Sequence, residues 1–228
     1  MAVEARPWQK APRTFTASEA PMIVVHHLNN SRSQRILWLL EELGTPYEIV
    51  RYQRDAVTNL APPELKAVHP LGKSPVITDG GRTLAESGAV ADYLIRRYGG
   101  GRLAPPAGSD DHETYLEWLH YAEGSAMLPL MLLLYTTRLG EAAQPLQGRI
   151  DSEIANHLGY VNQALEGRQF LLGEAFTGAD VQMSFVGEVG RAFGRLAALP
   201  ALNDWVDRLH ARPAFKRALE KGGPYNLA

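Results

Sequence analysis

Cysteine is absent from the 228-residue sequence. The absence excludes disulfides, thiolate metal sites, iron–sulfur clusters and a cysteine nucleophile that belongs to the protein. It also fits a reducing compartment, so we expect a cytoplasmic protein. Function classes that depend on a thiol of the protein itself are therefore excluded.

Long apolar segments are also missing. The longest apolar run, residues 126–135, is interrupted by Pro129 and has about half of the ~20 residues that a membrane-spanning helix needs. Residues 1–21 contain no apolar stretch of the kind that a signal peptide requires. We expect no membrane insertion.

Neither sign of charge dominates. The sequence has 23 Lys and Arg against 25 Asp and Glu, a formal net charge of −2. This balance gives no reason to expect binding to nucleic acid or to an anionic membrane surface. With 45% hydrophobic and 21% charged residues, the chain is typical of a globular protein of one large or two small domains.

The first half alternates strand and helix patterns. After a flexible extension at residues 1–21, the pattern begins at Met22. Strands are predicted at residues 22–25, 47–50, 75–77 and 83–84, and helices at 36–43, 62–68 and 90–98. The order βαβαββα over residues 22–100 predicts a small mixed sheet with helices on its faces.

The second half is predicted to be all helical. Residues 101–109 are rich in Gly and Pro and indicate a linker, which leaves residues 110–228 as a second domain. One long helix is expected over 110–138 with a kink at Pro129. Further helices are expected at 145–165, from about Thr177, and once or twice between 200 and 219.

The turn at residues 29–34 offers the first candidate site. Ser31 stands where the first strand passes into the first helix. In one interpretation, Ser31 and Gln34 form a capping box that only stabilises the helix start. In the other, the Ser31 hydroxyl donates to an anion, which the helix N-terminus also attracts.

Two further segments are candidates for ligand binding. Gly72-Lys73-Ser74 is not a phosphate loop, because Pro75 begins a strand where that motif needs a helix. Pro75 instead predicts a rigid turn or a cis bond, which would leave the Ser74 backbone free to pair with an extended peptide. Glu86 and Ser87 open a helix, either as a cap or as the binding site for an amino-acid head group.

Other motifs are assigned to folding. Thr177-x-x-Asp180 predicts a capping box that starts a buried helix. His26 and His27 are adjacent on a strand, so their rings point to opposite faces and cannot share a metal ion. Glu117-x-x-His120 lacks the second such motif that a di-iron site needs. We expect no metal site.

The order and spacing of these motifs resemble those of a cytosolic glutathione transferase. The resemblance covers nearly the whole chain from about Met22 and is most specific at residues 69–75 and 85–89. It is closest to the bacterial and fungal branch with serine or asparagine at the first turn. It implies a thioredoxin-like N-terminal domain, an all-α C-terminal domain, a homodimer, and glutathione as co-substrate with no other cofactor.

The resemblance also implies roles for individual residues. Ser31 would donate its hydroxyl to the glutathione sulfur, with Asn29 and Asn30 as donors that share or replace this role. A hydrogen bond of ~1.5–3 kcal/mol to the thiolate, with the helix dipole, would lower the thiol pKa by about two units. The residues implied to bind the rest of glutathione are Lys73 at the glycyl carboxylate, the Ser74 backbone beside a cis Pro75, and Glu86 and Ser87 at the γ-glutamyl head group.

The expected reaction is attack of the glutathione thiolate on an apolar electrophile, or on a peroxide. Candidates for the electrophile pocket, chosen by position and apolar character, are Leu28, Tyr121, Met127 and Tyr135. Thiol reduction through a protein cysteine is excluded by the composition. The alternative is a non-catalytic ligand carrier or a regulatory interaction protein on the same fold; the intact binding motifs favour the enzyme.

Overall fold

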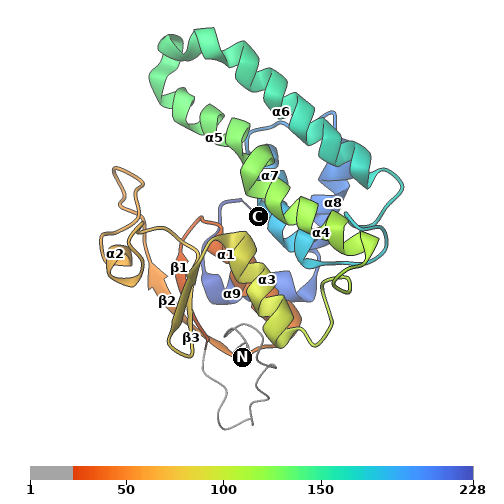
Figure 1. Ribbon diagram of the computed structural model, residues 1–228. Coiled ribbons are helices and arrows are strands. Elements are labelled where there is room, and N and C mark those ends of the chain that lie inside the picture. Colours follow the sequence, from red (N-terminus) through yellow and green to blue (C-terminus); the bar gives the residue numbers. More distant parts are fainter. Residues whose placement is uncertain (1–22, 228) are drawn as a thin grey trace, which may run out of the picture.

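The computed structural model describes residues 23–227 (Figure 1). The expected extension at residues 1–21 lies outside this range. The elements of the first half are β1 (Ile23–Leu28), α1 (Ser33–Leu43), β2 (Tyr47–Tyr52), α2 (Leu65–Val68), β3 (Val76–Asp79), β4 (Arg82–Ala85) and α3 (Ser87–Tyr98).

These elements form the predicted βαβαββα unit. The four strands make one mixed sheet in the order β2-β1-β3-β4, with β1 parallel to β2 and β3 antiparallel to both β1 and β4. β3 and β4 are joined by a tight turn at Gly80 and Gly81, whose φ angles of 54° and 80° favour glycine. The predicted mixed sheet is confirmed.

Helix α1 is buried on almost every side. Its apolar residues pack on the sheet, and its other faces contact α3, α7 and α9. Such a helix can bury polar side chains only where partners meet them, and Arg35 is one of these. Figure 1 shows α1 and α3 between the sheet and the helical half, so α1 lies at the centre of the molecule.

The second half is helical, as expected. Its elements are α4 (Asp110–Tyr121), η2 (Ala122–Ala126), α5 (Met127–Thr136), η3 (Thr137–Ala143), α6 (Gln144–Leu165), α7 (Gly178–Ala192), α8 (Pro200–His210) and α9 (Pro213–Gly222). α5 and α6 run antiparallel as two long arms (Figure 1). α9 returns to pack on α1, so the last helix belongs to the core of the first half.

The predicted long helix is continuous over residues 110–136, but the prediction that its irregularity lies at Pro129 is wrong. The interruption lies before the proline, in the π-helical turn η2, where the Met127 N–H donates to the Ala122 carbonyl. Pro129 therefore falls in the first turn of α5. Pro129 thus lies three residues after Ala126, the last residue of the π-helical turn, where the hydrogen-bond register of the helix already changes.

Helix α7 forms the core of the second half. Thr177 and Asp180 make the predicted capping box at its start, which is confirmed. Asp180 also accepts hydrogen bonds from the Leu171 N–H and from Trp205 Nε1, at 3.0 and 3.1 Å. Within residues 23–227, no helix combines the length and hydropathy needed to cross a bilayer.

Candidate active site

The turn between β1 and α1 places Ser31 two residues before the first residue of α1. Ser31 Oγ lies 2.8 Å from the Leu28 carbonyl and 2.8 Å from Ser33 Oγ, and it accepts the Ser33 N–H at 3.2 Å. The Gln34 side-chain amide is buried without a partner among the described residues. The capping-box interpretation of Ser31 and Gln34 is therefore wrong, because the Gln34 side chain does not return to the turn.

A buried neutral histidine continues this chain of hydroxyls. His27 Nδ1 lies 2.8 Å from Ser33 Oγ. Burial, with the charge of Arg51, lowers the His27 pKa to about 4, so the ring is neutral at pH 7. Its Nε2 faces the backbone of Gly222, with which His27 forms a hydrogen bond. The ring proton is therefore assigned to Nε2, and the Ser33 hydroxyl donates to Nδ1.

Asn29 and Asn30 form hydrogen bonds that connect the turn to neighbouring segments. Asn29 Oδ1 accepts the Arg54 N–H at 2.9 Å, and Arg54 Nε donates to the Asn29 carbonyl. Asn30 adopts a φ of 49° and its Oδ1 accepts the Asn226 N–H at 2.8 Å. Both amide oxygens thus connect the first turn to other segments of the chain.

The segment before β3 lies beside the same turn. The Ser74–Pro75 peptide bond is cis, one of the two possibilities that the sequence left open. Ser74 Oγ donates to the His26 carbonyl at 2.8 Å, so this loop is attached to the end of β1. Lys73 is exposed and Pro75 is buried.

The start of α3 is not capped by its own side chains. Glu86 precedes the helix with a φ of 71° and makes no side-chain capping bond, so the capping interpretation is wrong here too. Ser87 Oγ instead accepts hydrogen bonds from Arg35 Nη1 at 3.3 Å and from Gln182 Nε2 at 3.0 Å. Both lone pairs of this oxygen are occupied, so its proton is free to donate to a further group.

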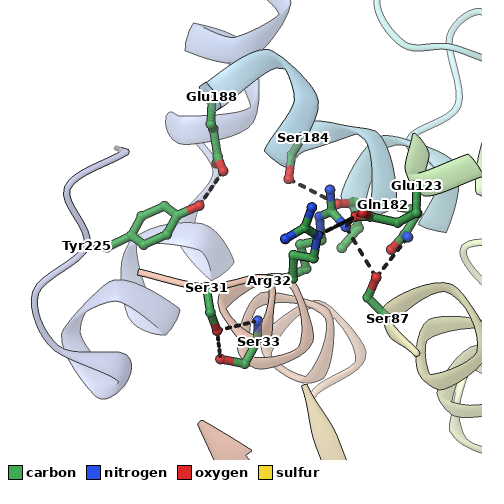
Figure 2. Close-up of polar contacts among 11 residues, drawn as sticks. Ser31, Arg32, Ser33, Ser87, Glu123, Gln182, Ser184, Glu188 and Tyr225 are labelled. Carbon is green, nitrogen blue, oxygen red and sulfur yellow. Dashed lines mark hydrogen bonds and ion pairs between the residues drawn. The ribbon is translucent and has the colours of Figure 1, made fainter. Parts of the chain in front are cut away.

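Arg32 and Glu123 belong to a partly buried ionic cluster (Figure 2), which also contains the buried Arg35. Glu123, carried by the π-helical turn η2, accepts from Arg35 Nη1 at 2.7 Å and from Arg32 Nε at 2.8 Å. Burial raises the pKa of Glu123, but the charges and hydrogen bonds of the two arginines outweigh it and hold the pKa below its usual range. Both guanidinium groups lie about 5 Å from the centre of the Phe185 ring. The Glu123 carboxylate thus forms ion pairs with two guanidinium cations.

A cleft of about 550 Å³ opens between the two halves beside Ser31. One wall comes from the first turn, the loop after β2 and the residues before β3. The other comes from α5, α7 and the C-terminal tail, where Tyr225 donates to Glu188 on α7 (Figure 2). The lining residues are Leu28, Asn30, Ser31, Arg32, Arg54, Thr58, Asn59, Leu60, Ala61, Lys73, Ser74, Met131, Leu134, Tyr135, Arg138, Phe185, Val189, Ala192, Phe193, Asn226 and Leu227.

The structure brings together about half of the residues selected from the sequence. Those that line the cleft are Leu28, Asn30, Ser31, Lys73, Ser74 and Tyr135. Those outside its lining are Asn29, Pro75, Glu86, Ser87, Tyr121 and Met127. Ser87 is nevertheless connected to the cleft through Arg35, Glu123 and Arg32.

Two of the pocket candidates need correction. Met127 is 1% exposed and packs in the core at the start of α5. The Tyr121 hydroxyl lies 2.7 Å from His157 Nδ1 on α6, and its ring packs on Trp118 and Tyr160. Both residues lie before the part of α5 that faces the cleft. Tyr121 is the last residue of α4 and Met127 is the first residue of α5, on either side of the π-helical turn.

Sequence reasoning missed the ionic cluster and most of the second wall. Arg35 precedes Leu39 by one helical turn, so an arginine on the apolar side of α1 was an available signal. Gln182 and Phe185 lie on α7, a helix that the sequence assigned to folding alone. Within residues 23–227, no group of His, Asp or Glu side chains is placed to hold a metal ion.

Comparisons with known proteins match both halves of the chain. The model of the glutathione S-transferase N-terminal domain matches residues 20–96, and the model of the C-terminal domain matches residues 124–213. Glutathione S-transferase 3 of Schizosaccharomyces pombe is 35% identical over 88% of this chain and 88% of its own length.

Solved structures agree with these matches. A glutathione S-transferase of Actinobacillus pleuropneumoniae is 36% identical, with a TM-score of 0.82 over 90% of this chain and 95% of its own. A glutathione transferase family member of Pseudomonas fluorescens, solved with two glutathione bound, is 27% identical, with a TM-score of 0.73 over 88% of this chain and 93% of its own. The matches identify the sheet half as a thioredoxin-like domain and favour an enzyme over a carrier or regulator. The chain belongs to the glutathione S-transferase family and is a glutathione transferase.

Proposed function

We propose that Ser31 stabilises the thiolate of bound glutathione, whose sulfur then attacks an apolar electrophile held in the cleft. The observation that carries this proposal is the position of Ser31. It lies at the cleft, under the N-terminus of α1 and on the same wall as Lys73 and Ser74. Asn30 lines the cleft and Asn29 does not, so the Asn30 side-chain amide N–H is the remaining alternative donor.

The rest of glutathione fits the neighbouring groups. Lys73 would meet the glycyl carboxylate, and the Ser74 backbone would pair with the cysteinyl part beside Pro75. At the start of α3, the free proton of Ser87 would donate to the γ-glutamyl carboxylate, because its oxygen already accepts two N–H donors. The exposed Glu86 would receive the ammonium group.

The hydroxyl of Ser31 must change partner to reach a thiolate. In the turn it donates to the Leu28 carbonyl or to Ser33 Oγ. Replacing a neutral hydrogen bond of ~0.5–1.5 kcal/mol by a charged one of ~1.5–3 gains about 1 kcal/mol, or about one unit of thiol pKa. The second expected unit would come from the α1 N-terminus and the Arg32 charge.

The reaction balances without a cofactor. The thiol proton leaves to solvent, and the thiolate sulfur forms a bond to the electrophilic carbon. The leaving group departs with the electron pair of the broken bond, or an addition acceptor takes up the pair and a proton from water. A free thiol with a pKa of about 8.5 is only ~3% thiolate at pH 7, so each unit of lowering raises the reactive fraction several-fold.

The test is the ultraviolet absorbance of bound glutathione thiolate as a function of pH. We expect a bound thiol pKa one to two units below that of free glutathione, and a rise of about one unit in Ser31→Ala with glutathione affinity nearly unchanged. The matched control is Ser33→Ala, the same deletion in the same turn. It should keep the low thiol pKa and instead lose ~1–3 kcal/mol of stability, since His27 Nδ1 and the Leu28 N–H lose their partner.

Other results would change the assignment. An unchanged thiol pKa in Ser31→Ala would move the role to Asn30. Binding of glutathione with an unshifted pKa in the wild type would contradict thiolate activation.

The proposal includes a homodimer. Exposed leucines on the two long arms support a protein contact there: Leu128 and Leu132 on α5 and Leu146 on α6 are 58%, 41% and 56% exposed. Sedimentation of the full chain should give twice the 25.1 kDa monomer mass, and a monomer at micromolar concentration would contradict it. The cytoplasmic location stays a prediction.

A further inference from the structure

We propose that the electrophile of this enzyme carries a negative charge, in the form of a carboxylate on an apolar body, and that Arg138 binds this carboxylate. The inference rests on the proposed function, because it concerns the second substrate of the same site. It depends on the sign of charge in the cleft, on the partners of each cation, and on the spacing of residues along α5 and the helical turn that follows it.

The charge of the cleft is opposite to that of the chain. Four basic residues line it: Arg32, Arg54, Lys73 and Arg138. None of its described lining residues is Asp or Glu. The whole sequence has a formal net charge of −2, so the positive charge is concentrated at this position. A concave surface lined by one sign of charge attracts ligands of the other sign.

Three of the four cations have another task. Arg32 is bound by Glu123. Arg54 Nη1 donates to the Asn59 carbonyl at 3.0 Å, and Nη2 donates to the Asn30 carbonyl at 3.3 Å. Lys73 is assigned to the glycyl carboxylate of glutathione.

Arg138 differs from these three. It is exposed in the helical turn after α5, and it forms no ion pair or side-chain hydrogen bond with another residue between 23 and 227. It is therefore the cation of the cleft that is available to a second ligand.

The position of Arg138 relative to the apolar lining of the cleft indicates where the second ligand would carry its charge. Met131, Leu134, Tyr135 and Arg138 follow the spacing i, i+3, i+4, i+7, so they form one stripe facing the cleft. A second stripe is formed by Phe185, Val189 and Ala192 on α7 and by Phe193 directly after it. An apolar body between the stripes would end at Arg138, where a guanidinium group binds a carboxylate with two parallel hydrogen bonds.

A matched pair of electrophiles tests this inference. 4-Chloro-3-nitrobenzoate and its neutral carboxamide react in the same way: the thiolate sulfur bonds to the ring carbon that carries chlorine, and chloride leaves with the bonding electrons. Each kcat/KM is divided by the uncatalysed rate with glutathione, which removes the difference in ring activation. We expect the benzoate to be favoured at least tenfold at low ionic strength, with the preference reduced by 0.5 M NaCl.

Variants assign the preference to one residue. In Arg138→Gln, the benzoate-to-carboxamide ratio should fall close to one. The control is Arg149→Gln, which removes the same charge from a 77% exposed arginine on α6 outside the cleft lining and should keep the wild-type ratio. An unchanged ratio in Arg138→Gln would overturn the assignment.

Failure of the inference and failure of the proposed function are distinguishable. Turnover of both compounds without a preference would overturn the inference and leave the transferase reaction intact. Calorimetry with the two glutathione conjugates tests the inference without turnover. The benzoate conjugate should bind at least tenfold more tightly than the carboxamide conjugate in wild type and not in Arg138→Gln, and equal affinities would overturn it.

Discussion

Arg35 Nη1 lies 3.3 Å from Ser87 Oγ, so a buried cation on α1 is joined directly to the first residue of α3. The Arg35 side chain is only 2% exposed, and its charge is therefore poorly screened by water and salt. The same nitrogen donates to Glu123. In the proposed binding mode, this contact would let α1 influence both the thiol end and the head-group end of glutathione.

The first prediction concerns this contact. Arg35→Met should raise the KM for glutathione at least tenfold and change kcat less, because Ser87 loses a charged donor but Ser31 is untouched. It should also lower the free energy of unfolding by about 3 kcal/mol, the cost of breaking a buried ion pair. Steady-state kinetics and urea unfolding measure the two effects. Arg96→Met, at an exposed i,i+4 pair with Asp92, should cost under ~1 kcal/mol.

A second prediction follows from the neutral His27. Its pKa is about 4 in the folded chain and 6.5 in the unfolded chain, so between these values the unfolded chain binds the proton and the folded chain does not. Stability should be fully present above pH 6.5 and should decrease as the pH falls towards 4. Between pH 7 and 5 the loss from this group is about 2 kcal/mol.

The comparison protein for this effect is His27→Asn. Its unfolding free energy should be lower at pH 7 but should decline by about 2 kcal/mol less than that of the wild type between pH 7 and 5. Burial also lowers the pKa of His26, which contributes to the same window in both proteins and cancels in the difference. Parallel pH profiles of the two proteins would contradict the prediction.

The third prediction concerns the capping box of α7. Asp180→Ala removes the acceptor of the Leu171 and Thr177 N–H groups and of Trp205 Nε1, all in the core. Since each abandoned buried donor costs ~1–3 kcal/mol, we expect a loss above ~3 kcal/mol in the free energy of unfolding. Thr177→Ala removes one cap and should cost ~1–2 kcal/mol. Equal losses in the two variants would argue against this account.

A fourth prediction uses two helical glycines. At Gly187 on α7, an added Cβ would lie 2.7 Å from Val206 Cγ2 and 3.2 Å from the Trp205 ring, so Gly187→Ala should destabilise by ~1–3 kcal/mol. At Gly148 on α6, an added Cβ meets no described atom within 4 Å. Gly148→Ala should therefore stabilise by ~0.5–1 kcal/mol. Thermal unfolding of both variants measures the contrast, and shifts of the same sign would contradict it.

Much of the fold could be predicted because it is encoded locally. The strand patterns and the capping box at Thr177 each depend on residues that are only a few positions apart in the sequence. The π-helical turn could not be predicted from Pro129, because proline is compatible with both a kink inside a helix and a position in its first turn. Tertiary packing decides between the two.

The residues of the candidate site also fall into those that the sequence could predict and those that it could not. Ser31, Ser74 and Ser87 stand in short motifs at element boundaries, where sequence patterns are informative. The connection from Arg35 to Ser87 spans 52 residues and that from Arg35 to Glu123 spans 88. A single sequence shows a buried arginine on α1, but its partners become visible only when α3 and the π-helical turn are folded against it.

The C-terminal tail has a practical consequence for work with this enzyme. The Asn226 N–H binds Asn30 Oδ1, and Leu227 lines the cleft. An affinity tag inserted directly after Leu227 would therefore begin at the cleft, and a matrix that holds such a tag would cover it. Kinetic measurements made before and after removal of the tag would show how far it obstructs the entry of the electrophile.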